Sequence, residues 1–272
     1  METTKTDFSL IDRPEILQIL FHPRSSASGE KPASGAAVLQ QIPVGEAIEI
    51  GACFHMKDRV SPNILFFHGN GEIVADYDDL GPIYNQLGIN FLAVDYRGYG
   101  TSTGRPTVAA MMADCHKIFH FVKTWLSANG YIGPLLVMGR SLGSASALEL
   151  AATHSNDISG LIIESGFAYV GPLLALLGAP PEVTADEDAL GFRNLGKIKL
   201  FTKPALIIHA ELDHIIPFAD GRALYDASGS QEKTFLKIPG ANHNDIFARA
   251  LSEYMTAVAN LAYKTMPGSA VR

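Results

Sequence analysis

The sequence predicts an α/β fold in which a mostly parallel twisted sheet is covered by helices on both faces. Short runs rich in apolar and β-branched residues alternate with helix-length segments over most of the 272 residues. Such alternation is typical of parallel strands joined by crossover helices. A hydrophobic content of 47% and a charged content of 18% indicate a globular chain with a substantial core. At this length we expect a single domain over residues 1–272.

Two strand-like runs near the start of the chain, residues 38–44 and 47–56, predict an N-terminal antiparallel hairpin. Before them, apolar residues recur at helical spacing over 13–23, and such a helix packs on its own domain or docks on a partner. After the hairpin the alternation begins. The expected strands of the main sheet are residues 64–67, 91–94, 135–138, 161–163, 205–208 and 234–238.

The longest departure from this alternation covers residues 167–203 and contains an apolar run followed by an acidic one. Two interpretations stay open: a small lid that excludes water from a site, and an extra helix packed on the core. The lid interpretation predicts that apolar residues of this segment line a substrate pocket together with residues of the loops that follow the strands. The candidate pocket residues are Gly71, Phe167, Leu173, Leu176 and Ile215.

Gly139-Arg140-Ser141-Leu142-Gly143 follows one of the expected strands and precedes a helical run of small residues. A serine on such a sharp strand-to-helix turn is held in strained backbone geometry, with its hydroxyl presented to a substrate. The flanking glycines leave room where a Cβ would clash, and the start of the next helix favours negative charge. Ser141 is therefore a candidate nucleophile for acyl transfer, and the alternative is a glycine-rich turn without chemistry.

A serine hydroxyl needs a base to take its proton, and the base needs a third group to fix its tautomer. His243 lies in a loop between the last expected strand and a helix, and Asp213 follows the strand expected at 205–208. We predict that His243 Nε2 lies at hydrogen-bonding distance from Ser141 Oγ and that Asp213 lies near Nδ1. A solvated histidine and a loop-capping aspartate are the alternatives. Glu164 and Glu211 are the fallback acids.

An acyl-transfer site also needs two N–H donors for the oxyanion. One is expected at Leu142, directly after the nucleophile. The other is expected in His68-Gly69-Asn70-Gly71, which follows the first parallel strand, and our choice is the N–H of Asn70 because it follows the conformationally free Gly69. We interpret His68 as structural.

Taken together, the chain resembles the α/β-hydrolase superfamily, and within it the small α/β-hydrolase-domain esterases, thioesterases and serine aminopeptidase-like enzymes. The resemblance covers about residues 63–246 and implies the α/β-hydrolase fold with a triad of Ser141, Asp213 and His243. The segments that carry it are His68-Gly69-Asn70-Gly71, Asp95-Tyr96-Arg97-Gly98-Tyr99-Gly100, Gly139-Arg140-Ser141-Leu142-Gly143, Asp213 with Pro217, and Gly240 with His243-Asn244-Asp245.

These residues predict a serine hydrolase that cleaves a carboxylic ester or thioester of a small or apolar acyl substrate through an acyl-enzyme. A serine peptidase of the same fold is the alternative within the superfamily. A non-catalytic ligand-binding module is the alternative of another class, because one fold hosts unrelated functions. Some relatives carry a membrane anchor or a cysteine-rich lipidated start, which this sequence lacks, so we expect a soluble substrate.

Charge and cysteine content restrict the partners. The net charge of −7 and the absence of a basic stripe argue against nucleic acid. No apolar segment has spanning length and no signal peptide is visible, and two cysteines in apolar runs suit a reducing compartment, so we expect a cytoplasmic protein. His116 and His120 have the spacing of metal ligands but no glutamate between them, and we expect neither a metal nor an organic cofactor. The sequence does not specify the oligomeric state.

Overall fold

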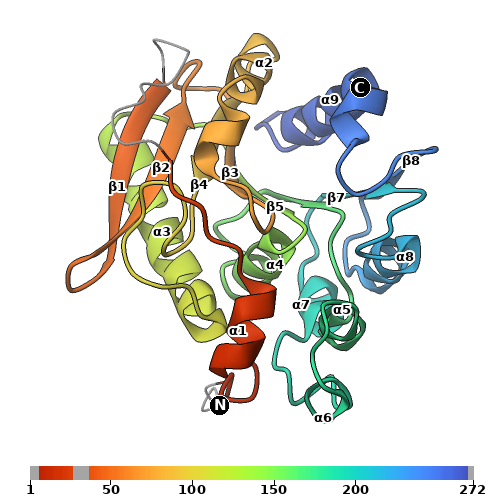
Figure 1. Ribbon diagram of the computed structural model, residues 1–272. Coiled ribbons are helices and arrows are strands. Elements are labelled where there is room, and N and C mark those ends of the chain that lie inside the picture. Colours follow the sequence, from red (N-terminus) through yellow and green to blue (C-terminus); the bar gives the residue numbers. More distant parts are fainter. Residues whose placement is uncertain (1–5, 27–36, 269–272) are drawn as a thin grey trace.

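The computed structural model describes residues 6–26 and 37–268, and these residues build an eight-stranded mixed sheet (Figure 1). The strands in chain order are β1 (Ala37–Gly45), β2 (Ile48–His55), β3 (Asn63–Phe67), β4 (Asn90–Val94), β5 (Leu135–Arg140), β6 (Gly160–Glu164), β7 (Ala205–Ala210) and β8 (Lys233–Ile238). Their order across the sheet is β1-β2-β4-β3-β5-β6-β7-β8. β1 pairs antiparallel with β2, and β2 antiparallel with β4, whereas the strands from β4 to β8 are parallel neighbours.

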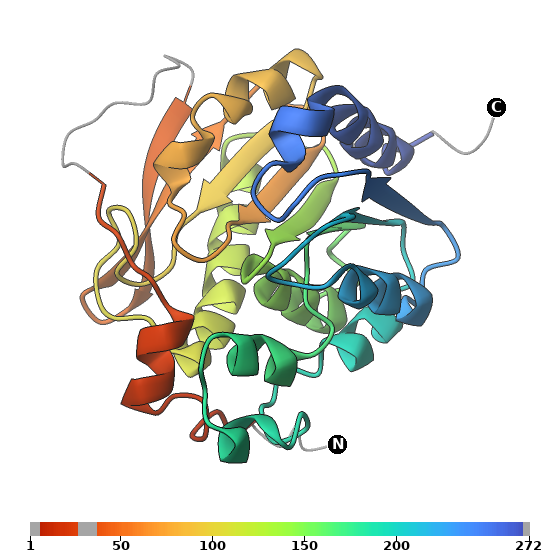
Figure 2. The ribbon, with the colours of Figure 1, turned by 45° about the vertical axis from the view of Figure 1, so that its right-hand side comes forward.

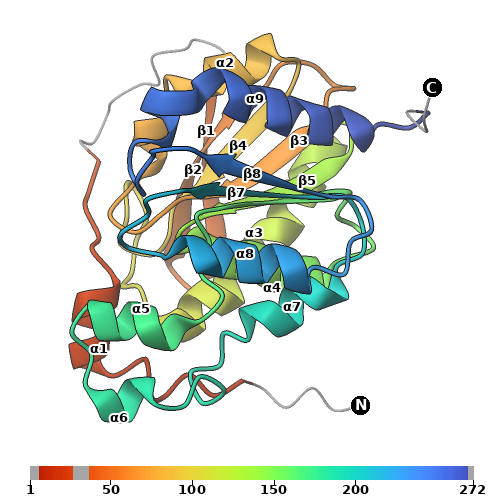
Figure 3. The ribbon, with the colours of Figure 1, turned by 90° about the vertical axis from the view of Figure 1, so that its right-hand side faces the viewer.

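Helices cover both faces of this sheet (Figure 3). In chain order they are α1 (Pro14–Leu20), the 3-10 helix η1 (Val74–Tyr77), α2 (Leu80–Gln86), α3 (Val108–Ala128), α4 (Gly143–Thr153), α5 (Val170–Leu176), α6 (Pro181–Thr184), α7 (Asn194–Leu200), α8 (Phe218–Ala227) and α9 (Ile246–Lys264). η1, α2 and α9 pack on one face, and α3, α4, α7 and α8 pack on the other. The chain therefore forms three layers with two apolar interfaces.

Side chains of the central strands alternate between these two interfaces, because successive residues of a strand point to opposite sides. In β3, Ile64 and Phe66 pack toward α2 and α9, whereas Leu65 and Phe67 pack toward the helices of the other face. All five residues of β3 are buried. Complete burial of such a side chain contributes about 1.5–3 kcal/mol. Burial on both faces explains why these strands appear in the sequence as continuous apolar runs.

The segment after β6 leaves the sheet and forms α5 and α6, which lie beside α1 (Figures 2 and 3). Two carboxylates fix its course: Asp220 accepts a hydrogen bond from the N–H of Ala168 at 2.8 Å, and Glu187 accepts one from the N–H of Val170 at 2.7 Å. By contrast, α7 packs on α4 and α8 in the layer against the sheet. Residues 167–203 thus combine an excursion from the sheet with a helix of the core layer.

The sequence predicted the hairpin and all six strands of the main sheet, with ends that differ by up to two residues. The helix expected over 13–23 ends earlier, at Leu20, and the chain continues in extended conformation from Phe21. Among the residues that the structure describes, no helix combines the length and apolar character needed to cross a bilayer.

Candidate active site

Ser141 occupies a strained turn between β5 and α4. Its φ of 51° lies in the left-handed region, which is unfavourable for a residue with a Cβ. The Ser141 N–H donates to the carbonyl of Glu164 at 2.9 Å, and the Ser144 hydroxyl donates to the Ser141 carbonyl at 2.6 Å. A Cβ on Gly143 would lie 2.1 Å from the carbonyl oxygen of Phe67, so α4 can approach β3 this closely only with glycine there. The turn therefore has the geometry expected of a nucleophile elbow.

His243 lies in the loop between β8 and α9, where its ring is buried. Its Nε2 is 3.0 Å from Ser141 Oγ. The loop is held from within by the N–H of Asn242, which donates to Asp245 at 2.7 Å, and from outside by Arg140, whose Nη2 donates to the His243 carbonyl at 2.9 Å. The imidazole is thus placed to accept the proton of the serine hydroxyl.

Asp213 lies on the other side of the imidazole, in the loop between β7 and α8, with Oδ2 2.7 Å from His243 Nδ1. Its other oxygen accepts hydrogen bonds from the N–H groups of Ile215 at 3.0 Å and Ile216 at 2.9 Å. Burial favours the protonated acid, but the hydrogen bond and charge of His243 and these two N–H groups outweigh burial and lower the pKa of Asp213. An ionised Asp213 fixes the tautomer in which His243 Nδ1 carries the proton.

The two fallback acids have other partners. Glu164 accepts hydrogen bonds from Arg140 Nε at 3.1 Å and from the Tyr254 hydroxyl at 2.7 Å. Glu211 accepts from Lys237 at 2.7 Å and from the N–H of Gly240 at 2.9 Å. Neither is hydrogen-bonded to the imidazole of His243, so Asp213 is the carboxylate that the geometry provides.

The two N–H groups expected at an oxyanion site belong to residues that line one cavity with Ser141. Leu142 directly precedes the first residue of α4, and Asn70 lies in the loop after β3. Within the described part of the chain, neither N–H donates a hydrogen bond to a protein acceptor. Buried or partly buried N–H groups without a protein partner are available to a ligand, and the helix dipole of α4 adds positive potential at Leu142.

The cavity beside Ser141 has a volume of about 260 Å³ and joins a polar side to an apolar one. Of the expected pocket residues, Leu173 and Ile215 line it. Its lining residues are Leu20, His22, Asn70, Glu72, Arg140, Ser141, Leu142, Leu173, Leu177, Ile215, His243 and Asn244.

Three expected pocket residues lie elsewhere. Phe167 is buried and its ring packs edge-on against Phe192, so it belongs to the apolar core. Leu176 is 60% exposed, and its neighbour Leu177 lines the cavity instead. Successive residues of a helix point about 100° apart, so the two side chains face different surroundings. Gly71 is not part of the lining; its φ of 75° instead shapes the turn after Asn70.

Sequence reasoning missed six lining residues: Leu20, His22, Glu72, Arg140, Leu177 and Asn244. Leu20 and His22 come from the N-terminal segment, which is held to the loop after β3: the His22 N–H donates to Asn70 Oδ1 and to the Tyr99 hydroxyl, both at 2.9 Å. The apolar helix pattern at 13–23 was the available signal, but it did not indicate which surface of the protein this segment covers. Among the others, Arg140 and Glu72 form an ion pair beside Ser141.

The histidines with metal-ligand spacing have protein partners. His116 Nδ1 lies 2.9 Å from His154 Nε2, and His116 Nε2 lies 3.3 Å from a carboxylate oxygen of Glu149. The rings of His120 and His154 are 5.2 Å apart and edge-on. Both nitrogens of His116 therefore face protein groups.

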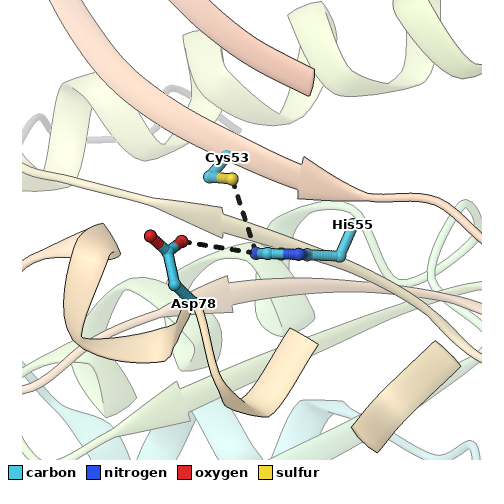
Figure 4. A group of neighbouring side chains, drawn as sticks. All are labelled: Cys53, His55 and Asp78. Carbon is cyan, nitrogen blue, oxygen red and sulfur yellow. Dashed lines mark hydrogen bonds and ion pairs between the residues drawn. The ribbon is translucent and has the colours of Figure 1, made fainter. Parts of the chain in front are cut away.

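A second group, Cys53, His55 and Asp78, brings three potential metal ligands within 4.8 Å of one another (Figure 4). His55 Nε2 lies 3.4 Å from Cys53 Sγ and 3.8 Å from Asp78 Oδ1. Burial, with the nearby Asp78 charge, raises the pKa of the Cys53 thiol to about 12, whereas a metal binds the thiolate. His55 Nδ1 has no hydrogen-bond partner among the described residues, although a metal-bound histidine usually donates its second N–H to an acceptor. We therefore describe this group as a buried thiol–imidazole pair.

The chain matches one protein family model and is similar to known proteins. A family model described as serine aminopeptidase, S33, matches residues 58–185. Alpha/beta hydrolase domain-containing protein 17C of Xenopus tropicalis is 29% identical over 231 residues, which are 81% of this chain and 69% of that protein. Human alpha/beta hydrolase domain-containing protein 17B is 31% identical over 201 residues, which are 69% of this chain and 64% of that protein.

A solved structure shares the fold at lower identity. The esterase Pf2001 of Pyrococcus furiosus superposes with a TM-score of 0.73 at 17% identity, over 90% of this chain and 99% of that one. This superposition, together with the strand order described above, identifies the fold as the α/β-hydrolase fold.

Proposed function

Because the chain belongs to the α/β-hydrolase superfamily, we propose that it is a serine hydrolase that cleaves a carboxylic ester or thioester with an apolar acyl group. The observation that carries this proposal is the hydrogen-bonded series Asp213–His243–Ser141, which ends at a cavity with an apolar wall. Strained backbone at the nucleophile, together with a buried acid of lowered pKa, is typical of a site built for chemistry.

In the first half of the proposed reaction, Ser141 Oγ bonds to the acyl carbon while His243 Nε2 takes the hydroxyl proton. The carbonyl oxygen becomes an oxyanion, which the N–H groups of Leu142 and Asn70 receive. Asp213 stabilises the imidazolium through Nδ1. The tetrahedral intermediate then collapses: the bond to the leaving oxygen or sulfur breaks, and His243 gives its proton to that atom.

In the second half, water attacks the acyl-enzyme and His243 accepts a proton from the water. The same two N–H groups receive the second oxyanion, and the acid product leaves as the proton returns to Ser141 Oγ. The net reaction adds one water and releases the acid and the alcohol or thiol. Every proton moves through one imidazole, so no further titrating group is required.

The side chains of Leu20, Leu142, Leu173, Leu177 and Ile215 favour an apolar acyl group. A cavity of about 260 Å³ is near the lower end of ligand sites, which measure roughly 300–1,000 Å³. We therefore propose short or medium acyl chains as the preferred substrates. Both cysteines are free and buried, and on that ground we place the reaction in the cytoplasm.

A serine peptidase is the second candidate, favoured by the match of residues 58–185 to the aminopeptidase family model. An aminopeptidase must hold the ammonium group of its substrate, and a carboxylate is the usual partner for such a group. Glu72 is the carboxylate at the cavity, but it already accepts hydrogen bonds from the N–H of Gly69 at 2.7 Å and the Tyr77 hydroxyl at 2.6 Å and pairs with Arg140. This pairing favours ester over peptide substrates.

The test is labelling of the purified protein by a fluorophosphonate probe, with Ser141→Ala and His243→Ala as comparisons. Labelling that is lost in both variants would support the proposed nucleophile and base. Hydrolysis of p-nitrophenyl esters of graded acyl length, set against aminoacyl p-nitroanilides, would then separate esterase from peptidase. A folded wild type that neither reacts with the probe nor turns over any of these substrates would favour the non-catalytic ligand-binding module.

A further inference from the structure

We propose that Arg140, the residue before the nucleophile, is a positioning residue that holds the histidine loop and the oxyanion loop in place around Ser141. This inference rests on the proposed hydrolase function. It assigns a role to the variable second position of Gly-x-Ser-x-Gly, which the reaction itself does not use.

The guanidinium of Arg140 is buried at the carboxyl end of β5 and contacts three separate segments. Nη2 donates to the carbonyl of His243 at 2.9 Å, Nε donates to Glu164 at the end of β6 at 3.1 Å, and Nη1 pairs with Glu72 in the loop after β3. A guanidinium has five N–H donors in a rigid plane, so it fixes the relative positions of its partners. One side chain therefore ties the base loop to the nucleophile strand.

The contact with Glu72 extends to the proposed oxyanion loop. Glu72 Oε2 accepts the N–H of Gly69 at 2.7 Å, and Gly69 directly precedes Asn70. A Cβ on Gly69 would lie 2.8 Å from Arg140 Nη1 and 2.9 Å from Glu72 Oε2, so the ion pair packs tightly against this backbone. The position of the Asn70 N–H is thus linked to Arg140 through two consecutive contacts.

Geometry, rather than charge alone, is the contribution that we assign to Arg140. Its two carboxylate partners are held independently, Glu164 by the Tyr254 hydroxyl and Glu72 by Tyr77 and Gly69. A lysine at position 140 would keep a positive charge, but an ammonium is a point charge on a flexible stem and cannot contact all three segments in one plane. Arg140→Lys therefore separates the positioning role from charge neutralisation.

The first experiment measures ester hydrolysis by Arg140→Lys. We expect kcat to fall roughly 10- to 100-fold because a displacement of about 1 Å in a catalytic group can cost about 100-fold in rate, while KM stays within about threefold because the apolar lining is intact. Arg97→Lys is the matched control: Arg97 makes a two-bond pair with Asp114 at 2.6 and 2.9 Å and does not line the cavity beside Ser141, so its replacement should leave kcat unchanged.

Glu72→Gln provides a second variant should Arg140→Lys fail to fold, since it removes a charge but keeps an acceptor for Gly69. We expect a fall of about 10-fold in kcat, and in the double variant a loss smaller than the product of the single losses, because both residues act in one network.

The results that would refute the positioning role of Arg140 differ from those that would refute the proposed hydrolase function. A folded Arg140→Lys protein with wild-type kcat, or Arg140 and Glu72 effects that simply multiply, would overturn the positioning role while leaving the hydrolase in place. A wild-type protein without any hydrolysis or probe labelling would instead remove the proposed function, and this inference with it.

Discussion

Asparagine in place of Asp213 tests whether the acid controls the tautomer of His243. The Oδ1 atom of Asp213 accepts two backbone N–H groups, at 3.0 Å from Ile215 and 2.9 Å from Ile216, and an asparagine would retain these bonds with its carbonyl oxygen. Its NH₂ group would then occupy the position of Oδ2, 2.7 Å from His243 Nδ1. Because an NH₂ group donates, Nδ1 would have to accept, and the proton would move to Nε2.

A histidine protonated at Nε2 faces Ser141 Oγ with a donor, so it cannot take the hydroxyl proton. The imidazolium also loses the anion that stabilises it. In serine hydrolases with this arrangement such a change lowers kcat by about 10⁴, or about 5.4 kcal/mol of transition-state stabilisation. We expect the same order here, measured as kcat for a p-nitrophenyl ester and as the rate of fluorophosphonate labelling, with KM nearly unchanged.

Asp220→Asn is the matched control. Asp220 is as buried as Asp213, and it accepts hydrogen bonds from the backbone N–H groups of Ala168 and Tyr169 without contacting His243. Its replacement should alter stability but not the chemical step. If Asp213→Asn retained more than about a tenth of wild-type kcat in a folded protein, the tautomer argument would be refuted.

Three further changes have defined expectations. Gly143→Ala should lower the melting temperature and abolish probe labelling, because the new Cβ would lie 2.1 Å from the Phe67 carbonyl oxygen; thermal unfolding and labelling check this. Leu173→Trp should fill part of the 260 Å³ cavity and shift the ester preference toward shorter acyl chains, seen as a changed ratio of kcat/KM for butyrate and octanoate. Finally, the pKa of Asp213 is lowered in the folded protein, so its ionised form stabilises the fold above pH 3.8, and this stabilisation is lost as the pH falls through the folded-state pKa. The difference in urea midpoint between wild type and Asp213→Asn should therefore shrink from pH 7 to pH 3.

Each of these expectations has a contrary result. Full labelling of Gly143→Ala would show that the backbone can yield at the elbow. An unchanged chain-length ratio in Leu173→Trp would place the acyl group elsewhere, with the equivalent change at the exposed Leu176 as the control. A urea difference that is constant with pH would mean that Asp213 has the same affinity for protons in the folded and unfolded states.

The fold was predictable because the central strands β3 to β7 are short apolar runs that are buried on both faces, with turn residues beside them. The ends of the strands were less predictable. β5 and β6 extend to Arg140 and Glu164, and charged residues in a sequence usually indicate solvent. Here the two side chains are buried together, with Arg140 Nε 3.1 Å from a carboxylate oxygen of Glu164, and this pairing offsets part of the cost of burying them. A pairing between residues 24 apart in sequence is not visible in any local pattern.

The contrast between local patterns and non-local contacts also explains which parts of the site could be predicted from the sequence. Ser141, Asp213 and His243 each follow a strand, and parallel strands bring their carboxyl ends to one edge, so local pattern and topology were sufficient to place them together. The cavity wall depends on helix rotation and on how distant segments dock. Leu177 rather than Leu176 faces the cavity because successive helical residues point in different directions. Leu20 lines the cavity because hydrogen bonds between His22 and Asn70 hold the N-terminal segment to the loop after β3. The substrate preference that we propose depends on these non-local contacts, so predicting it requires the folded structure. The proposed reaction class depends on local motifs and strand topology, so the sequence was sufficient to predict it.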